Sequence, residues 1–258
     1  TQEPDLVALA IHPDARDTYW QSIWRSNTVK TIICEKPLAE NVNEAKTIIN
    51  KCASLDIRLY VNYQRRANAT YLTLRDEIKS GSRGHLQNVI IHYNHGVKTN
   101  ACHWINLALM MFGNPKWVSA ETSPIPSPYP NDPNATILLG YDNFHLQLVP
   151  LMSPQTSFYS NDMILTFDNE RIVVPDPTMY QKQHAKRWAE IGGLLEDAEN
   201  NVVVENFDND FQPLLDLILN DISQKQPYTI SPIEELQVLE IVKLAENSAL
   251  KHRRMDLD

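Results

Sequence analysis

The sequence predicts an α/β protein in which a doubly wound parallel sheet is followed by an α+β domain with a largely antiparallel (mixed) sheet. Three apolar runs, at 5–11, 29–34 and 57–63, alternate with two segments of helical period. Strands that are apolar along their whole length are typical of parallel sheets covered by helices on both faces. After residue 80 the strands mix polar with apolar residues, which indicates a sheet with one uncovered face.

The elements follow from hydrophobic period and stop signals. Residues 14–27 and 40–56 have helical period, and a helix over 68–81 ends at Gly81. A helix over 101–113 is apolar nearly all round, so we expect it to be buried. We also predict strands at 84–96, 116–123, 135–142, 144–151, 163–168 and 171–176, a proline-rich surface loop at 123–133, and amphipathic helices at 211–224 and 232–252. These elements predict two domains, 1–80 and 81–258, with the last helix able to pack back on the first domain.

Composition and charge narrow the functional class. The 258 residues are 43% hydrophobic and 21% charged, which is enough for a large core. A net charge of -9 argues against nucleic acid as a partner, and the basic run at 251–254 is interpreted as a solvated tail. No segment has the roughly 18 to 20 uninterrupted apolar residues that span a bilayer, so we expect no membrane partner.

Cysteine usage and the opening residues bear on the compartment. Cys34, Cys52 and Cys102 are scattered and form no CxxC pair, which favours neither a disulfide framework nor a zinc site. The first residues lack the basic start and apolar run of a signal peptide. We therefore expect a soluble cytoplasmic protein.

One ionisable residue lies at the end of a predicted buried strand. Lys36 stands between Glu35 and Pro37, directly after the apolar run that ends at Cys34. Open parallel sheets bind ligands beyond the carboxyl ends of their strands. A lysine there could hold a ligand oxygen, stabilise a developing alkoxide or donate a proton. An exposed loop lysine at a helix start is an equally weighted alternative.

Residues 34–49, CEKPLAENVNEAKTII, resemble the Glu-Lys-Pro motif of the glucose-fructose oxidoreductase and inositol dehydrogenase (Gfo/Idh/MocA) family. Residues 60–96 resemble its third strand, Arg-Arg turn, linking helix and next strand, and residues 231–250 its closing helix. The similarity covers nearly the whole chain in order. It implies a partial Rossmann-like first domain, a catalytic Lys36, and a nicotinamide site lined by Glu35, Lys36 and Pro37.

The second signature of the family, D-x-G-x-H-x-x-D, aligns with residues 99–106, TNACHWIN. Only His103 is retained, because Thr99, Ala101 and Asn106 replace the two acids and the glycine. The resemblance implies that His103 accepts the proton of a secondary alcohol and that Thr99, Asn100 and Asn106 contact the substrate. The alternative is a hydrogen-bonded core histidine, and the loss of the acid at Thr99 puts catalysis in question.

Two pairs of residues complete the candidate site. Arg65 and Arg66 follow the third strand, and Arg65 is predicted to bind a sugar or phosphate with its guanidinium. One of the two arginines is equally suited to a structural ion pair. His12 and Pro13 stand where the family has a Thr-Pro pair close to the cofactor, which implies cofactor binding; a surface-turn histidine is the alternative.

The resemblance implies NAD or NADP as the cofactor. Complete family members open with a Gly-rich turn that admits the cofactor diphosphate, and no G-x-G-x-x-G occurs in this sequence. We therefore expect a leading segment to be absent from it. A metal is not expected, because His92 and His95 have no acidic or cysteine ligand near them in the sequence.

The sequence thus predicts an NAD(P)-dependent oxidoreductase that transfers a hydride between the cofactor and a secondary hydroxyl of a sugar, nucleotide sugar or cyclitol. The alternative is a catalytically degenerate ligand-binding or assembly protein on the same scaffold. The predicted partner is a small sugar-like molecule. The uncovered face of the second-domain sheet predicts a homodimer or homotetramer.

Overall fold

The computed structural model describes residues 4–151, 161–175, 182–191, 194–197, 202–205, 211–225 and 227–257. The chain divides into two compact units. Unit 1 comprises Thr1–Gln64 and Pro213–Glu240, and unit 2 comprises Arg65–Gln212 and Ile241–Asp258. The units therefore divide the chain after residues 64, 212 and 240. The functional domains 1–80 and 81–258 stay a prediction.

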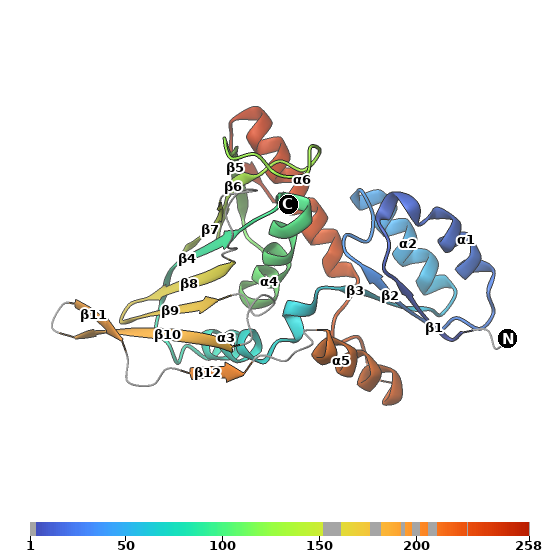
Figure 1. The fold of residues 1–258 in the computed structure, drawn as a ribbon, viewed down its shortest axis with the longest axis horizontal. Helices are drawn as coiled ribbons and strands as arrows, with labels where there is room; N and C mark the ends of the chain where they lie inside the picture. Colours follow the sequence, from blue (N-terminus) through green and yellow to red (C-terminus); the bar gives the residue numbers. More distant parts are fainter. Residues whose placement is uncertain are drawn as a thin grey trace. The chain divides into compact units, whose positions relative to one another are not determined.

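Unit 1 is built on a small parallel sheet. Its strands β1 (Leu6–Leu9), β2 (Thr31–Glu35) and β3 (Arg58–Asn62) lie in the order β1-β2-β3 (Figure 1). The connecting helices are α1 (Asp17–Arg25) and α2 (Val42–Ser54), and α5 (Gln212–Ser223) belongs almost wholly to this unit. In β2 the first four residues are all buried. This confirms the prediction that apolar runs form strands of a parallel sheet.

Unit 2 is built on a mixed sheet. Among the described strand pairs of unit 2, only β4 with β7 is parallel. The strand order is β11-β10-β9-β8-β4-β7-β6-β5-β13, with β12 beside β10. The strands are β4 (Leu86–Tyr93), β5 (Trp117–Thr122), β6 (Ala135–Gly140), β7 (His145–Pro150), β8 (Asp162–Phe167), β9 (Glu170–Pro175), β10 (Lys182–Ile191), β11 (Leu194–Asp197), β12 (Val202–Glu205) and β13 (Met255–Asp256). The largely antiparallel (mixed) sheet predicted from the sequence is confirmed.

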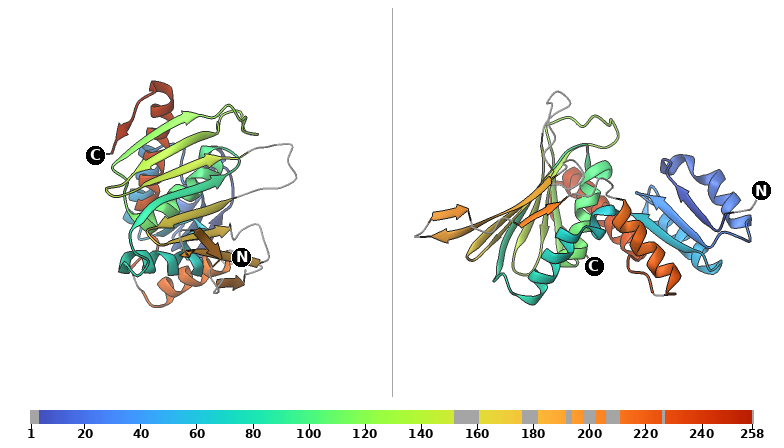
Figure 2. Two further views of the ribbon diagram at one scale, coloured as in Figure 1. Left: turned by 90° about the vertical axis from the view of Figure 1, so that its left-hand side faces the viewer. Right: turned by 60° about the horizontal axis from the view of Figure 1, so that its bottom comes forward.

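Helix packing in unit 2 leaves one face of the sheet open. Helix α4 (Cys102–Phe112) lies against one face (Figure 2), and Val89, Ile91 and Tyr93 of β4 are buried while the alternate residues are not. Eight of the eleven α4 residues are buried, as predicted. The other helices are α3 (Ala69–Ser80), which ends at the left-handed Gly81, and α6 (Ile233–Lys251), which runs through both units.

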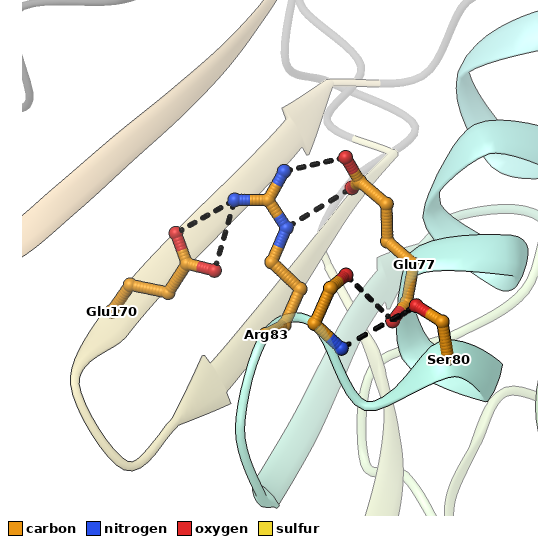
Figure 3. Close-up of polar contacts among 5 residues, drawn as sticks. Glu77, Ser80, Arg83 and Glu170 are labelled. Atoms are coloured by element: carbon orange, nitrogen blue, oxygen red, sulfur yellow. Dashed lines mark hydrogen bonds and ion pairs between the residues drawn. The ribbon is translucent and has the colours of Figure 1, made fainter.

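An arginine fastens the end of α3 to the sheet (Figure 3). The Arg83 guanidinium donates to both carboxylate oxygens of Glu77, at 2.6 and 3.1 Å, and to both oxygens of Glu170, at 3.2 and 3.3 Å. The side chains of Ser80 and Ser82 donate to the Glu77 carbonyl oxygen and complete the helix end. Two bidentate contacts from one fork fix the connection between α3 and β9.

The C-terminal residues are anchored rather than loose. Residues 251–254 are exposed, as the interpretation as a solvated tail requires, but the chain then forms β13, which pairs with β5. The buried Ser248 hydroxyl donates to the Arg253 carbonyl oxygen at 2.7 Å and accepts from the Ala120 N–H at 2.9 Å. The basic run is therefore solvated, as predicted, and the backbone on either side of it is fixed.

Among the helices that the structure describes, none is both long enough and apolar enough to cross a bilayer.

Candidate functional site

One candidate region is the carboxyl edge of the unit 1 sheet. Glu35 and Asn62 are paired residues at the ends of β2 and β3, and the Asn62 amide donates to a Glu35 carboxylate oxygen. Lys36 follows β2 directly, and its peptide bond to Pro37 is cis. The strand order thus places Glu35, Lys36 and Pro37 together at the edge where parallel sheets bind ligands.

A buried arginine holds the turn that carries Lys36. The Arg16 side chain is 1% exposed, and its Nη1 donates to the carbonyl oxygens of Pro37 and Leu38 at 2.6 and 3.1 Å. Its Nε donates to the Ile11 carbonyl oxygen at 2.8 Å. A guanidinium satisfies three carbonyls at once because its donors form a rigid planar fork. Arg16 therefore joins the segment after β1 to the turn after β2.

A buried glutamate holds the same turn through its N–H groups. Glu235 of α6 is 1% exposed, and its Oε1 accepts from the Leu38 backbone N–H at 2.9 Å. Its Oε2 accepts from the Tyr63 hydroxyl at 2.7 Å. Burial raises the pKa of Glu235 to about 7, although these hydrogen bonds and the nearby charges of Lys36 and Arg16 act to lower it. An acid that titrates near neutrality thus lies behind the Lys36 turn.

His12 and Pro13 occupy the segment after β1. Pro13 is buried and begins a short 3-10 helix, whereas the His12 side chain is 74% exposed and its Nδ1 lies 2.7 Å from Asp14. Both residues follow β1, which is parallel to β2, so they lie at the same edge of the sheet as the Lys36 turn. The Arg16 side chain links the two segments, because it donates to the carbonyl oxygens of Ile11 and Pro37. The exposed position of His12 matches the alternative of a surface-turn histidine.

A separate candidate region is the start of α4 in unit 2. A π-helical turn, Val97–Ala101, precedes α4, and the segment 132–134 accepts its first N–H groups. The acceptors are Asn134 Oδ1 for Gly96, the Pro133 carbonyl for Val97, Asp132 Oδ1 for Lys98 and Asp132 Oδ2 for Thr99, at 2.8, 3.3, 2.7 and 2.7 Å. A carboxylate at this end of a helix is favourable because the unsatisfied N–H groups carry partial positive charge.

The predicted residues of this region lie along that turn and helix. Thr99 and Asn100 are in the π-helical turn and are partly buried, and His103 in the first turn of α4 is partly buried too. Asn106 is 2% exposed. Among the residues that the structure describes, the Oδ1 atoms of Asn100 and Asn106 have no hydrogen-bond partner. Such buried acceptors can receive hydroxyl groups of a ligand.

Arg65 and Arg66 are also in unit 2 and are buried, with exposures of 5% and 7%. The Arg65 guanidinium carbon lies 4.7 Å from the centre of the Trp104 ring, which comes from α4. This stacking fixes Arg65 beside the helix that carries His103. Within the described ranges no group of three or more potential metal ligands occurs, and His92 pairs with Asp162 at 2.9 Å.

Three residues of the site were not predicted from the sequence: Arg16, Glu235 and Asp132. All three are charged and buried, with exposures of 1%, 1% and 6%. Their partners are largely backbone groups, which leave no pattern in a sequence. The one signal in the sequence was the acid in the proline-rich loop 123–133, because a carboxylate between prolines has few local N–H groups to bind.

Comparisons with known proteins agree with the fold. Residues 1–63 match the model of an oxidoreductase family with an NAD-binding Rossmann fold, the Gfo/Idh/MocA family. The chain is similar in structure to aldose-aldose oxidoreductase from Caulobacter crescentus, complexed with glycerol, with a TM-score of 0.79 and 18% identity over 98% of this chain and 79% of that one.

Two other solved structures were determined with a nicotinamide cofactor. One is WlbA dehydrogenase from Bordetella pertussis with NADH and UDP-GlcNAcA, with a TM-score of 0.73 and 17% identity over 99% of this chain and 80% of that one. The other is an oxidoreductase from Agrobacterium radiobacter with NAD+, L-tartaric acid and magnesium, with a TM-score of 0.71 and 16% identity over 98% and 80%. The resemblance noted in the sequence is thereby confirmed: residues 1–63 match the model of the Gfo/Idh/MocA oxidoreductases, and the chain shares its fold with solved oxidoreductases.

Proposed function

We propose that this protein transfers a hydride between NAD or NADP and a secondary hydroxyl of a sugar, nucleotide sugar or cyclitol. The observation that carries the proposal is the placement of Lys36. It lies at the carboxyl end of β2, on a turn held by two buried charged side chains, Arg16 and Glu235, within the segment that matches an NAD-binding family. A turn so firmly held is suited to aiming one ammonium group at a reacting oxygen.

The residues at this edge fit the nicotinamide end of the cofactor. Among the described residues, Asn62 Oδ1 is buried and has no hydrogen-bond partner, so it can accept from an amide or a ribose hydroxyl. Glu35 is held beside it, and Lys36 follows directly. When bound, the cofactor supplies a hydride acceptor or donor. Pro13 and Pro37 would line the site and His12 would contact its rim.

The proposed roles follow from the balance of the reaction. An alcohol carbon that loses a hydride becomes a carbonyl, and its hydroxyl must lose a proton as well. The Lys36 ammonium would stabilise the oxygen as negative charge develops, and His103 is proposed to take the proton. Arg65, Thr99, Asn100 and Asn106 are proposed to bind the remaining hydroxyl or phosphate groups. In the reverse direction the proton moves from His103 to the oxygen.

A second candidate is a catalytically degenerate binding or assembly protein. The observation that favours it is the replacement of two acids and a glycine of the family signature by Thr99, Asn106 and Ala101. Such a protein would bind cofactor or sugar without turnover. The two candidates therefore differ in turnover and not in ligand affinity.

The test is a titration with NADH and with NADPH, followed by fluorescence, together with turnover assays on a panel of sugars, nucleotide sugars and cyclitols. Lys36→Met should lower turnover at least about 100-fold while cofactor binding persists. The matched control is Lys30→Met, at the exposed opposite end of the same strand region, which should leave turnover unchanged. Cofactor binding without any turnover across the panel would favour the degenerate alternative; no binding of either cofactor would refute the oxidoreductase and leave a protein that binds sugars or partners without turnover.

The open sheet face of unit 2 supports a further proposal, a homodimer or homotetramer. Ile90, Ile164 and Val173 are only partly buried and stand on neighbouring strands β4, β8 and β9. An apolar strip of this kind is commonly covered by a second copy. Light scattering of the wild type and of Ile164→Glu tests it, since a lower mass is expected only for the variant.

The compartment is proposed to be the cytoplasm. Cys34, Cys52 and Cys102 are buried free thiols, which suits a reducing environment. Localisation of the tagged full-length protein by fractionation tests this assignment.

A further inference from the structure

We propose that Glu235 is a positioning residue for Lys36: as a carboxylate it holds the backbone of the Lys36 turn, and it loosens that hold when it takes up a proton. This inference rests on the proposed function of Lys36 and adds a proton-dependent control to it. Glu235 comes from α6, far along the chain from the turn it contacts, so only the folded unit 1 brings the two together.

The geometry assigns both oxygens of the carboxyl group to acceptor roles. Oε1 receives the Leu38 N–H at 2.9 Å, two residues after Lys36, and Oε2 receives the Tyr63 hydroxyl at 2.7 Å. A carboxylate can accept both hydrogen bonds, whereas a carboxylic acid turns one oxygen into a donor. The Tyr63 hydroxyl can turn to accept from the acid, but the Leu38 N–H then faces a neutral oxygen. Because hydrogen bonds to a charged acceptor are the stronger ones, protonation of Glu235 weakens its hold on Leu38.

Arg16 holds the turn from its carbonyl side. It donates to the carbonyl oxygens of Pro37 and Leu38, so the Leu38 peptide groups are held by Arg16 through oxygen and by Glu235 through nitrogen. The backbone that follows Lys36 cannot shift without breaking a buried hydrogen bond, which is costly. When Glu235 releases the Leu38 N–H, the arginine contacts still hold the carbonyl side of the turn.

The electrostatic surroundings place the switch near neutral pH. Burial raises the pKa of Glu235 to about 7. The hydrogen bonds from Tyr63 and Leu38 and the positive charges of Lys36 and Arg16 act in the opposite direction and keep the pKa from rising further. The carboxyl group thus changes protonation in a range where Lys and Arg side chains ordinarily stay charged.

Two other ionisable groups are near Glu235. The Cys34 thiol is buried, which raises its pKa to about 12 with a smaller contribution from Glu235, so it stays neutral through this range. Glu234 precedes Glu235 on α6 and is partly buried. The Cys34 thiol therefore supplies no titration near pH 7 in place of Glu235.

The first experiment reads the Glu235 carboxyl directly and needs no activity. The full-length protein is labelled with glutamate carrying ¹³C at the carboxyl carbon, and its NMR signals are followed against pH. A signal with a midpoint at about 7 should vanish in Glu235→Gln and persist in Glu240→Gln, an exposed acid on the same helix. In Lys36→Met the midpoint should rise, because the Lys36 charge lowers it in the wild type. A midpoint that Lys36→Met does not move would overturn the inference.

The second experiment measures kcat and KM against pH with the substrate found in the panel. Glu235→Gln should lower kcat about tenfold above pH 7 with little change in cofactor affinity, because a displaced group costs rate rather than binding. It should also remove the inflection near pH 7 that the wild type and Glu240→Gln retain. A Glu235→Gln profile with the wild-type inflection would overturn the inference.

The two experiments separate this inference from the proposed function. A Glu235 midpoint that responds to Lys36 in a protein without turnover would support the placement and refute the enzyme. Turnover that depends on Lys36 but not on Glu235 would support the enzyme and refute the positioning role.

Discussion

Gly96 and Asp132 pack against each other so closely that no side chain fits between them. A Cβ atom on Gly96 would lie 2.5 Å from the Asp132 carboxyl carbon and 2.6 Å from its carbonyl oxygen, and Gly96 has a φ of +82°. We predict that Gly96→Ala destabilises unit 2 by more than the roughly 1–3 kcal/mol of backbone strain alone, because the new methyl group also displaces Asp132. Urea unfolding measures the difference.

The matched control for that substitution is Gly113→Ala. Gly113 has a similar φ of +79°, but nothing lies within 4 Å of the point where its Cβ atom would be. It should show the strain without the clash, so its cost should be the smaller of the two. Equal losses of stability would show that Gly96 is required for its backbone conformation only.

Asp132→Asn tests the carboxylate that receives the N–H groups of Lys98 and Thr99. An asparagine offers one acceptor oxygen and leaves the other N–H opposite an amide donor, so we expect a loss of about 1–3 kcal/mol in the free energy of unfolding. The exposed Asp142, whose side chain is 73% accessible, is the control, and Asp142→Asn should change stability by at most about 0.5 kcal/mol. A stable Asp132→Asn variant would mean that water replaces the carboxylate.

The pH dependence of stability should carry the signature of Glu235. Its pKa rises from 4.5 to about 7 on folding, so the folded protein binds more protons than the unfolded chain between these values, and stability falls as pH rises through that window. The loss is on the order of 3 kcal/mol at full ionisation. Denaturant unfolding at several pH values should show this decline in the wild type and in Glu240→Gln but not in Glu235→Gln. A flat wild-type curve would contradict the raised pKa.

His92 should also make the free energy of unfolding fall as pH rises, but at higher pH than Glu235 and for a different reason. Its hydrogen bond to Asp162 raises its pKa above 6.5 despite partial burial. The stability that this pair provides is present below pH 6.5 and is lost as pH rises through the folded pKa. His92→Gln should therefore reduce stability at pH 6 more than at pH 8. His85 forms a similar pair with Asp168, but the His85 side chain is 92% exposed. His85→Gln should therefore have little effect on stability at either pH.

Most of the fold could be predicted from apolar runs and glycine stop signals in the sequence. The runs at 5–11, 29–34 and 57–63 contain all or nearly all of β1, β2 and β3, because a strand buried on both faces must be apolar throughout. The helix ends at Gly81 and Gly113 were also predicted, because glycine commonly ends helices. In the structure both glycines have positive φ, a conformation that glycine adopts without steric cost. Strand β10 (Lys182–Ile191) was missed because its sequence, KQHAKRWAEI, has no apolar run and few apolar residues in alternation.

The candidate site was only half predictable for a related reason. The Glu-Lys-Pro motif pointed to Lys36, but the side chains that hold its turn are Arg16, before the second strand, and Glu235, near the start of the last helix. In the sequence each resembles a solvated helix charge. Their burial arises from tertiary packing against backbone groups, which hydrophobic period does not record. The same holds for Asp132, which is buried within the loop 123–133 that was predicted to lie on the surface.

The pairing of β13 with β5 also covers an edge of the sheet that could otherwise pair with strands of other molecules. Lys116 and Val118 would otherwise present backbone hydrogen-bonding groups along the margin of a ten-stranded sheet, but Leu257 and Met255 occupy that margin. Uncovered sheet margins recruit strands from other molecules and seed aggregates. Removal of residues 252–258 should therefore yield a protein that folds but precipitates on concentration.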